Sequence, residues 1–105
     1  MAEHYSHFCI GQLVHHKLFD YRGVIVDVDP NFQGSQEWYD LMALSKPPKN
    51  KPWYHVLVHD SVHSTYVAEQ NLEPDLSGHA VNHPDIDNYF ERYENGLYIP
   101  RARKN

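Results

Sequence analysis

Residues 23–29 read Gly-Val-Ile-Val-Asp-Val-Asp, and they decide the fold. The run is rich in β-branched residues, which favour a strand, and alternation places Val24, Val26 and Val28 on one side. Asp29-Pro30-Asn31 ends the strand, because proline cannot donate to a β-ladder. A strand of this kind needs partners, and the neighbouring sequence offers several.

Other alternating segments predict these partners. Residues 10–18 place Ile10, Val14 and Leu18 on one face. A turn or bent corner at 19–23 joins them to the first strand. Downstream, the pattern predicts a hairpin of two strands and a last short strand, at 53–59, 64–68 and 97–99.

Helical spacing occurs at 36–44, where Ser35 is positioned as the N-cap. This helix must end before residues 46–52, which hold three prolines and three lysines and predict an extended loop. Residues 69–74 predict a short helical turn closed by proline.

The C-terminal third predicts a second helix. From Asp85 onward, apolar residues recur at i, i+3, i+4 and i+7, which is the stripe of an amphipathic helix. Asn95-Gly96 is placed to cap it. The residues of the stripe are Ile86, Tyr89, Phe90 and Tyr93.

These elements predict a mainly β protein. The chain has 105 residues, which fits one domain over 1–105, with a core at about 8–100 and flexible ends, including the tail 101–105. We expect a small SH3-like, partly open antiparallel barrel with one inserted short helix and a C-terminal helix, because closure removes exposed strand edges. An OB-like barrel is the second choice.

The charge pattern restricts any role with nucleic acid. The formal net charge is −5 and the pI about 5.9, whereas dedicated nucleic-acid binders usually present a basic surface. Nine histidines would make the net charge positive if all were protonated. DNA binding would have to rest on one of two basic patches, Lys46/Lys49/Lys51 and Arg101/Arg103/Lys104.

No pattern in the sequence indicates catalysis, a cofactor or a metal. His55, His59 and His63 are four apart, but that spacing does not converge ligands along a strand and turn. No Gly-x-Ser-x-Gly turn or phosphate-binding glycine loop is present. Cys9, in an apolar run, predicts a buried structural thiol. Without a signal peptide or an apolar run of spanning length, we expect a cytoplasmic protein with no membrane contact.

The best candidate interaction site is the loop from Lys46 to Trp53. Its lysines Lys46, Lys49 and Lys51 supply charge, and Trp38 and Trp53 flank it. Such a loop can meet phosphates and stack on bases, or meet an acidic protein. Equally, it can be a solvated, proline-stiffened loop with both tryptophans in the core, where helical spacing favours Trp38. The tail with Arg101, Arg103 and Lys104 is the alternative site.

The same segments resemble a known family, the HspQ/YccV ("hemimethylated DNA-binding") proteins, over roughly residues 8–100. The order and spacing of the pieces carry the resemblance, since none is a strong motif alone. The matching pieces are Phe8 to Gly11, Val14-His15-His16, Tyr21 to Asp29, Glu37-Trp38-Tyr39, Lys51 to Val58, Tyr66 to Leu72, Asn82-His83-Pro84 and Tyr89-Phe90.

The resemblance implies a small β-barrel, induction by heat shock and a homo-oligomer, a trimer. It implies an accessory factor that promotes degradation of denatured or unstable proteins, including the replication initiator, by an ATP-dependent protease such as Lon. It also implies the alternative, a module that binds hemimethylated DNA. The acidic balance favours the first function, and the Lys46–Lys51 loop favours the second.

Overall fold

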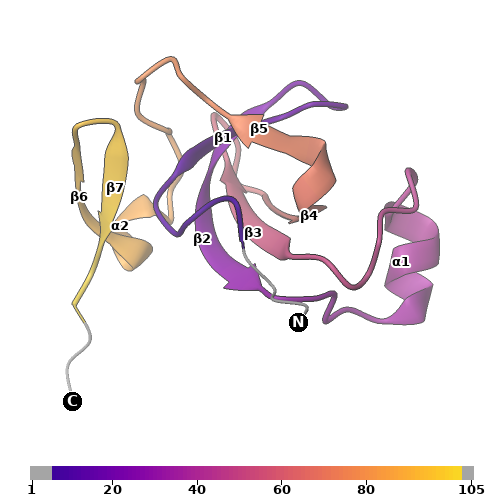
Figure 1. Ribbon diagram of the computed structural model, residues 1–105. Helices are drawn as coiled ribbons and strands as arrows, with labels where there is room; N and C mark the ends of the chain where they lie inside the picture. Colours follow the sequence, from indigo (N-terminus) through magenta and orange to yellow (C-terminus); the bar gives the residue numbers. More distant parts are fainter. Residues whose placement is uncertain (1–5, 103–105) are drawn as a thin grey trace.

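The computed structural model describes residues 6–102 and shows a mainly β, antiparallel fold (Figure 1). The prediction of this fold class is confirmed. The strands are β1 Leu13–His16, β2 Arg22–Asp29, β3 Trp53–Val58, β4 Ser64–Ala68, β5 Leu72–Pro74, β6 Phe90–Glu94 and β7 Leu97–Pro100. The helices are α1 Gln36–Met42, the 3₁₀ turn η1 Glu69–Asn71 and α2 Ile86–Tyr89.

Five strands form one sheet in the order β4-β3-β2-β1-β5, and β6 and β7 form a separate hairpin. Every pairing is antiparallel. The two outer strands, β4 and β5, are joined in sequence by η1 but are not paired with each other, so the sheet stays open at this seam. In Figure 1 the hairpin lies on one side of the sheet and α1 on the other.

Each face of the sheet buries its own apolar cluster. Tyr54 and Val56 of β3 pack with Ile25 of β2 in one cluster. Leu57, on the opposite face of β3, packs with Phe90 of the hairpin in a second cluster. The sheet is thus covered on both sides, which is how so short a chain buries a core.

A β-bulge in β2 corrects the face predicted for Val28. The register shifts between Ile25 and Asp27, leaving Val26 as the extra residue. Because a bulge reverses the alternation, Val28 packs with the cluster of Ile25, whereas Val26 packs with the opposite cluster. The prediction that Val24, Val26 and Val28 share one side is therefore wrong for Val28.

The strand predicted at 10–18 is also shorter than expected. Only Leu13–His16 forms β1, and Ile10 and Leu18 are exposed. Gly11 explains why the strand begins late: its φ is +93°, its N–H donates to the Ile25 carbonyl, and its carbonyl accepts from the Tyr98 N–H. Cys9 lies in this irregular segment and is exposed, so the prediction of a buried thiol is wrong.

The predicted C-terminal helix is wrong beyond Tyr89. The chain leaves α2 after one turn, and Phe90–Glu94 continues as strand β6, which pairs with β7. Asn95 and Gly96 both have positive φ, +54° and +80°, so they form the hairpin turn rather than a helix cap. Asn-Gly is the strongest short signal for such a turn. The last strand predicted at 97–99 is confirmed.

The inserted helix α1 is confirmed where predicted. The Ser35 hydroxyl accepts a hydrogen bond from the Trp38 N–H at 3.0 Å, which caps its first turn. The loop 46–52 that follows contains no helix or strand. Within residues 6–102, no helix is long and apolar enough to span a bilayer.

Candidate functional site

A groove of about 340 Å³ runs along β4. One wall is the turn between β1 and β2, which contributes Leu18 and Phe19. The other wall is α1 with the segment that follows it, including Met42 and Leu44. All five residues of β4 line the groove, so its long axis follows the outer strand of the sheet.

A cluster of aromatic rings in edge-on and tilted contact forms and supports the groove wall beside α1. The rings of Trp38 and Tyr66 lie 5.7 Å apart, and Phe32 lies 4.8 Å from Trp53. Trp53 is only 1% exposed, and its Nε1–H donates to the Pro48 carbonyl at 3.2 Å. Trp53 is therefore part of the core beneath the groove, and the suggestion that it stacks on a base is wrong. Trp38, as its spacing indicated, packs into the same cluster.

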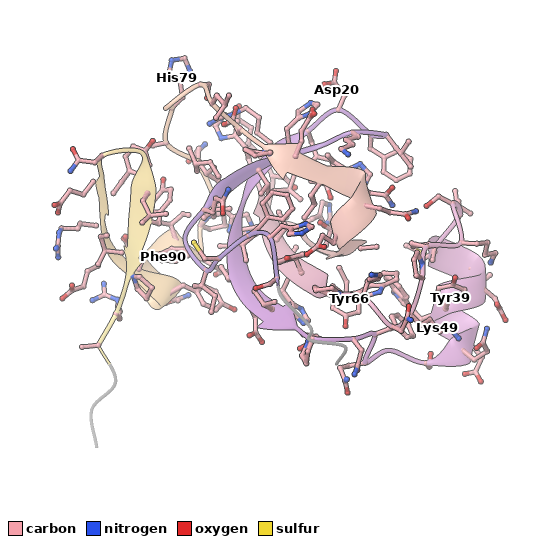
Figure 2. The ribbon with its side chains drawn as sticks, in the orientation of Figure 1. Asp20, Tyr39, Lys49, Tyr66, His79 and Phe90 are labelled. Carbon is pink, nitrogen blue, oxygen red and sulfur yellow. The ribbon has the colours of Figure 1, made fainter. Side chains whose placement is uncertain are left out.

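The loop lysines lie beside these aromatic rings. Lys49 Nζ lies 4.4 Å from the centre of the Tyr39 ring and 5.7 Å from that of Phe32. Lys46 Nζ lies 5.2 Å from the Tyr39 ring centre. Figure 2 shows Lys49 next to Tyr39, at the same end of the molecule as Tyr66. All three loop lysines are exposed, but Lys46 Nζ lies 3.9 Å from Asp40 Oδ1, and Lys49 Nζ donates to the side-chain oxygen of Gln36.

Lys17 adds a fourth charge that the sequence reasoning missed. It lines a second hollow together with Lys51, and this hollow shares Ala68 with the groove. The groove and its four surrounding lysines are called the lysine-rimmed groove here; the lysines are Lys17, Lys46, Lys49 and Lys51.

The other cations among the described residues are held elsewhere. Arg22 forms an ion pair with Asp75, and Arg92 pairs with Glu91 and Glu94. These contacts leave the lysine-rimmed groove as the main cationic surface of the described residues.

Arg101, the described basic residue of the C-terminal tail, is not part of this surface. The Nε–H of Arg101 donates to the carbonyl of Asp87 at 2.6 Å, beside α2. That contact lies at the hairpin end, away from α1 (Figure 1). Arg103 and Lys104 lie outside the described residues. The structure thus does not bring Arg101 to the loop lysines.

The apolar side chains at the groove were also missed. Leu18, Phe19, Met42 and Leu44 are between 57% and 72% exposed, although each is strongly hydrophobic. A contiguous exposed apolar surface usually marks a binding site. The sequence did contain one indication of this surface. Leu18 and Phe19 lie at a predicted turn, where two adjacent apolar residues are not expected to reach the core.

His16 fixes the turn that carries Leu18 and Phe19. Its ring is buried, and Nδ1 accepts the backbone N–H groups of both residues at 3.1 Å. The ring also stacks on Phe19 with centroids 4.8 Å apart. Burial lowers the pKa of His16, and the neighbouring His15 lowers it further. The neutral ring is the form that can accept both bonds.

The pKa of His15, whose side chain lies on the opposite face of β1, is shifted in the opposite direction. Its two nitrogens contact Asp20 at 2.6 Å and Glu73 at 2.7 Å. The hydrogen bonds to these two carboxylates raise the pKa of His15. A charged His15 therefore ties the turn to β5, while a neutral His16 supports it from within.

Asp29 joins three strands beside the groove. Its Oδ2 accepts a hydrogen bond from the Tyr66 hydroxyl at 2.7 Å and contacts His55 Nε2 at 3.2 Å. Burial raises the pKa of Tyr66, and its bond to Asp29 adds to the shift, so the hydroxyl stays a donor. The register of β2 and β3 pairs Asp27 with His55 and so brings the imidazole to this carboxylate group.

This group also has the spacing of metal ligands. Within the described residues, the donor atoms of Asp27, Asp29 and His55 all lie within 4.8 Å of one another. Two carboxylates and an imidazole can bind a divalent cation. In the protein alone, Asp29 already satisfies its Oδ2 through Tyr66 and His55, so the group also serves to hold those two rings.

A comparison with protein-family models matches residues 6–97 to one family, described as hemimethylated DNA-binding protein YccV like. The match spans nearly all described residues, including the groove, α1 and the lysine loop. The chain belongs to the YccV-like family. The family description names DNA binding and no reaction, and it confirms the resemblance drawn from the sequence. The YccV-like match ends at Leu97, before Arg101 and the rest of the tail.

Proposed function

We propose that this YccV-like chain binds DNA through the lysine-rimmed groove and prefers a hemimethylated site. The observation that carries the proposal is the gathering of four lysines around an aromatic, apolar groove in a chain of net charge −5. Lysines meet phosphates and position the duplex, whereas apolar surface is what distinguishes a methyl group from water.

The methyl preference follows from burial. An N6-methyl group of adenine projects into the major groove, where an apolar wall can cover it. Met42 and the rings of Trp38 and Tyr66 offer such a wall. Burying one methyl group contributes about 0.8 kcal/mol, which corresponds to a roughly fourfold preference. The overall negative charge limits the total affinity, so binding should be modest and sensitive to salt.

The test is an anisotropy titration with hemimethylated, unmethylated and fully methylated duplexes of one sequence. We expect the hemimethylated duplex to bind about fourfold more tightly than the unmethylated duplex, and the fully methylated duplex shows whether a second methyl group is tolerated. Replacing all three loop lysines, as Lys46→Glu, Lys49→Glu and Lys51→Glu, should abolish binding and leave the circular dichroism spectrum unchanged. Equal affinity for hemimethylated and unmethylated DNA at moderate salt would rule out the methyl preference, and affinity that survives the triple change would move the site elsewhere.

A matched pair of single variants locates the surface. Lys51→Glu and Arg92→Glu change the net charge equally, but Arg92 lies in the hairpin, paired with its own glutamates. Only Lys51→Glu should weaken DNA binding. Equal losses would show that the lysine-rimmed groove has no special role.

A second function is favoured by the exposed apolar residues of the groove. Leu18, Phe19, Met42 and Leu44 suit an unfolded protein segment better than a phosphate backbone. We propose that the chain also acts as a heat-shock accessory factor that presents unstable proteins, including the replication initiator, to an ATP-dependent protease such as Lon. An unchanged degradation rate of such clients on adding the purified chain would eliminate this function.

Both functions are proposed for a homo-oligomer, a trimer, acting in the cytoplasm. A light-scattering mass three times that of the chain, 12.4 kDa, would support the assembly. A monomer mass would contradict it.

A further inference from the structure

The outer edge of β4 is a free strand edge. Within residues 6–102, β4 pairs only with β3. The hydrogen bonds from Val58 N–H to the His63 carbonyl and from Glu69 N–H to the Pro52 carbonyl mark the pairs at its two ends. In an antiparallel ladder, hydrogen-bonded pairs alternate with pairs that are not hydrogen-bonded. The backbone N–H and C=O groups of Thr65 and Val67 therefore also point toward β3. The N–H groups of Ser64, Tyr66 and Ala68 therefore point outward.

These outward groups have no partner among the described residues. No backbone or side-chain group of residues 6–102 accepts from those three N–H groups, and none donates to the carbonyls of Ser64 and Tyr66. Proteins usually protect such an edge with a lysine, a proline or a bulge. The sequence of β4, Ser-Thr-Tyr-Val-Ala, has neither lysine nor proline, and its ladder with β3 runs without a register shift.

The edge opens into the lysine-rimmed groove. The groove is lined by all of β4, by Leu18 and Phe19 on one wall and by Trp38 and Met42 on the other. Apolar side chains thus lie to both sides of a row of unpaired peptide groups. A strand places successive side chains on opposite faces, so an added strand would fill both walls while its backbone bonded β4.

The charged residues around the edge of β4 indicate which kind of partner would bind there. Lys17 precedes Leu18 on one wall, and Lys46 lies between the groove residues Ser45 and Pro47 on the other. The nearby carboxylate of Asp20 is bound by His15, and that of Asp29 by His55 and Tyr66. The carboxylates of Glu37 and Asp40 on α1 and of Glu69 in the second hollow also lie nearby, and Asp40 Oδ1 is 3.9 Å from Lys46 Nζ. The four lysines outnumber these three carboxylates, so the charge beside the groove is positive on balance, which favours an acidic partner.

We propose that an extended, apolar segment of an unfolded acidic protein adds to the edge of β4 as a further strand. This inference rests on the client-binding function proposed above and specifies its binding mode. Backbone hydrogen bonds would supply affinity for any extended sequence, whereas the apolar walls and the lysines would supply the preference for apolar segments with acidic flanks.

The experiment uses reduced, carboxymethylated α-lactalbumin, an acidic chain that stays unfolded, as the probe. Ser64 is exposed and its N–H faces outward, so Ser64→Pro removes a binding group without removing a bond to β3. Ser64→Ala, which keeps the N–H, is the matched control. We expect Ser64→Ala to bind the probe as tightly as the original chain does, and Ser64→Pro to bind it at least tenfold more weakly. Both variants should melt within a few degrees of the original chain.

Hydrogen exchange measured by NMR provides a second readout that needs no substitution. In the free protein, the Ser64, Tyr66 and Ala68 amides should exchange faster than those of Thr65 and Val67, which bond β3. Saturating probe should slow the first three and leave the other two unchanged.

The possible outcomes distinguish strand addition at β4 from client binding in general. Probe binding without slowed exchange at Ser64 and Tyr66, or with equal affinity for Ser64→Pro and Ser64→Ala, would overturn strand addition and leave client binding intact. No probe binding would overturn both.

Discussion

The Tyr66 hydroxyl reaches from β4 across β3 to the carboxylate of Asp29 on β2, at 2.7 Å. The bond spans three strands of the sheet at the margin of the groove. The bond holds the Tyr66 ring, which forms part of the groove wall, in place against the Asp29 carboxylate of β2. Stability and the binding surface therefore depend on the same contact.

Tyr66→Phe tests this contact. The substitution keeps the ring but removes the hydroxyl, so Asp29 loses one of its charge-assisted hydrogen bonds and the exposed Gln33 N–H loses its acceptor, 3.0 Å away. We expect unfolding in urea to become easier by about 1–2 kcal/mol. Tyr21→Phe is the control, because the Tyr21 hydroxyl bonds only the neutral Thr65, at 2.6 Å, and should cost about half as much. Equal losses would show that the Asp29 charge adds nothing.

Acid should loosen the turn that His16 supports. Because the pKa of His16 in the folded protein lies below the ordinary value of 6.5, the unfolded chain takes up its proton first as the pH falls. The contribution of His16 is complete above pH 6.5 and is lost as the pH falls below it. His16→Asn, whose amide oxygen can accept the same N–H groups, should reduce this loss, measured as melting temperature against pH.

His15 should act in the opposite direction. Its pKa is raised by Asp20 and Glu73, so its stabilising contribution is complete below pH 6.5 and disappears as the pH rises through the folded-state value. His15→Gln should therefore lower stability at pH 6 more than at pH 8. The reverse order would contradict the assigned charge of His15.

Gly11→Ala should destabilise the docking of the C-terminal hairpin. A Cβ at position 11 would collide with the Tyr98 carbonyl, and the φ of +93° is itself unfavourable for alanine. We expect a loss of about 2–3 kcal/mol by chemical denaturation. Gly78→Ala is the matched control: its φ is also positive, at +73°, but no atom lies within 4 Å of its Cβ position. It should cost about 1–2 kcal/mol from backbone strain alone.

The salt dependence of DNA binding counts the lysines involved. If all four lysines of the groove contact phosphates, the logarithm of affinity should fall against the logarithm of salt concentration with a slope of about −3.6. Lys51→Ala should reduce the magnitude of that slope by about one. An unchanged slope would place Lys51 outside the interface.

Local patterning predicted most of the sheet, because alternating β-branched residues carry their own signal. Residues 23–29, 53–58 and 64–68 are strands as expected, and Ser35 caps α1. The C-terminal helix failed at Tyr89, where two signals conflicted. A helical stripe that includes Phe90 and Tyr93 competed with Asn95-Gly96, and the hairpin turn prevailed because Phe90 buries completely against Leu57 and Tyr98.

The site was predictable only in part. The loop lysines are adjacent in sequence, so their clustering was visible at once. Lys17, Leu18 and Phe19 reach the groove only because the sheet folds the first turn beside β4. The link from Asp29 to His55 depends on a bulge at Val26, and a one-residue change of register is not encoded in alternation.

The separation of α1 from the hairpin gives the molecule an electric dipole. At the α1 end, Lys46, Lys49 and Lys51 outnumber the carboxylates of Glu37 and Asp40. At the other end, the carboxylates of Asp85, Asp87, Glu91 and Glu94 outnumber Arg92 and Arg101 around α2 and the hairpin (Figure 1). A polyanion would repel the hairpin end and attract the α1 end, so the molecule would turn during diffusion before any contact forms. Because of this steering, the chain would meet a polyanion in one productive orientation although its own net charge is negative. The association rate would increase as the ionic strength decreases.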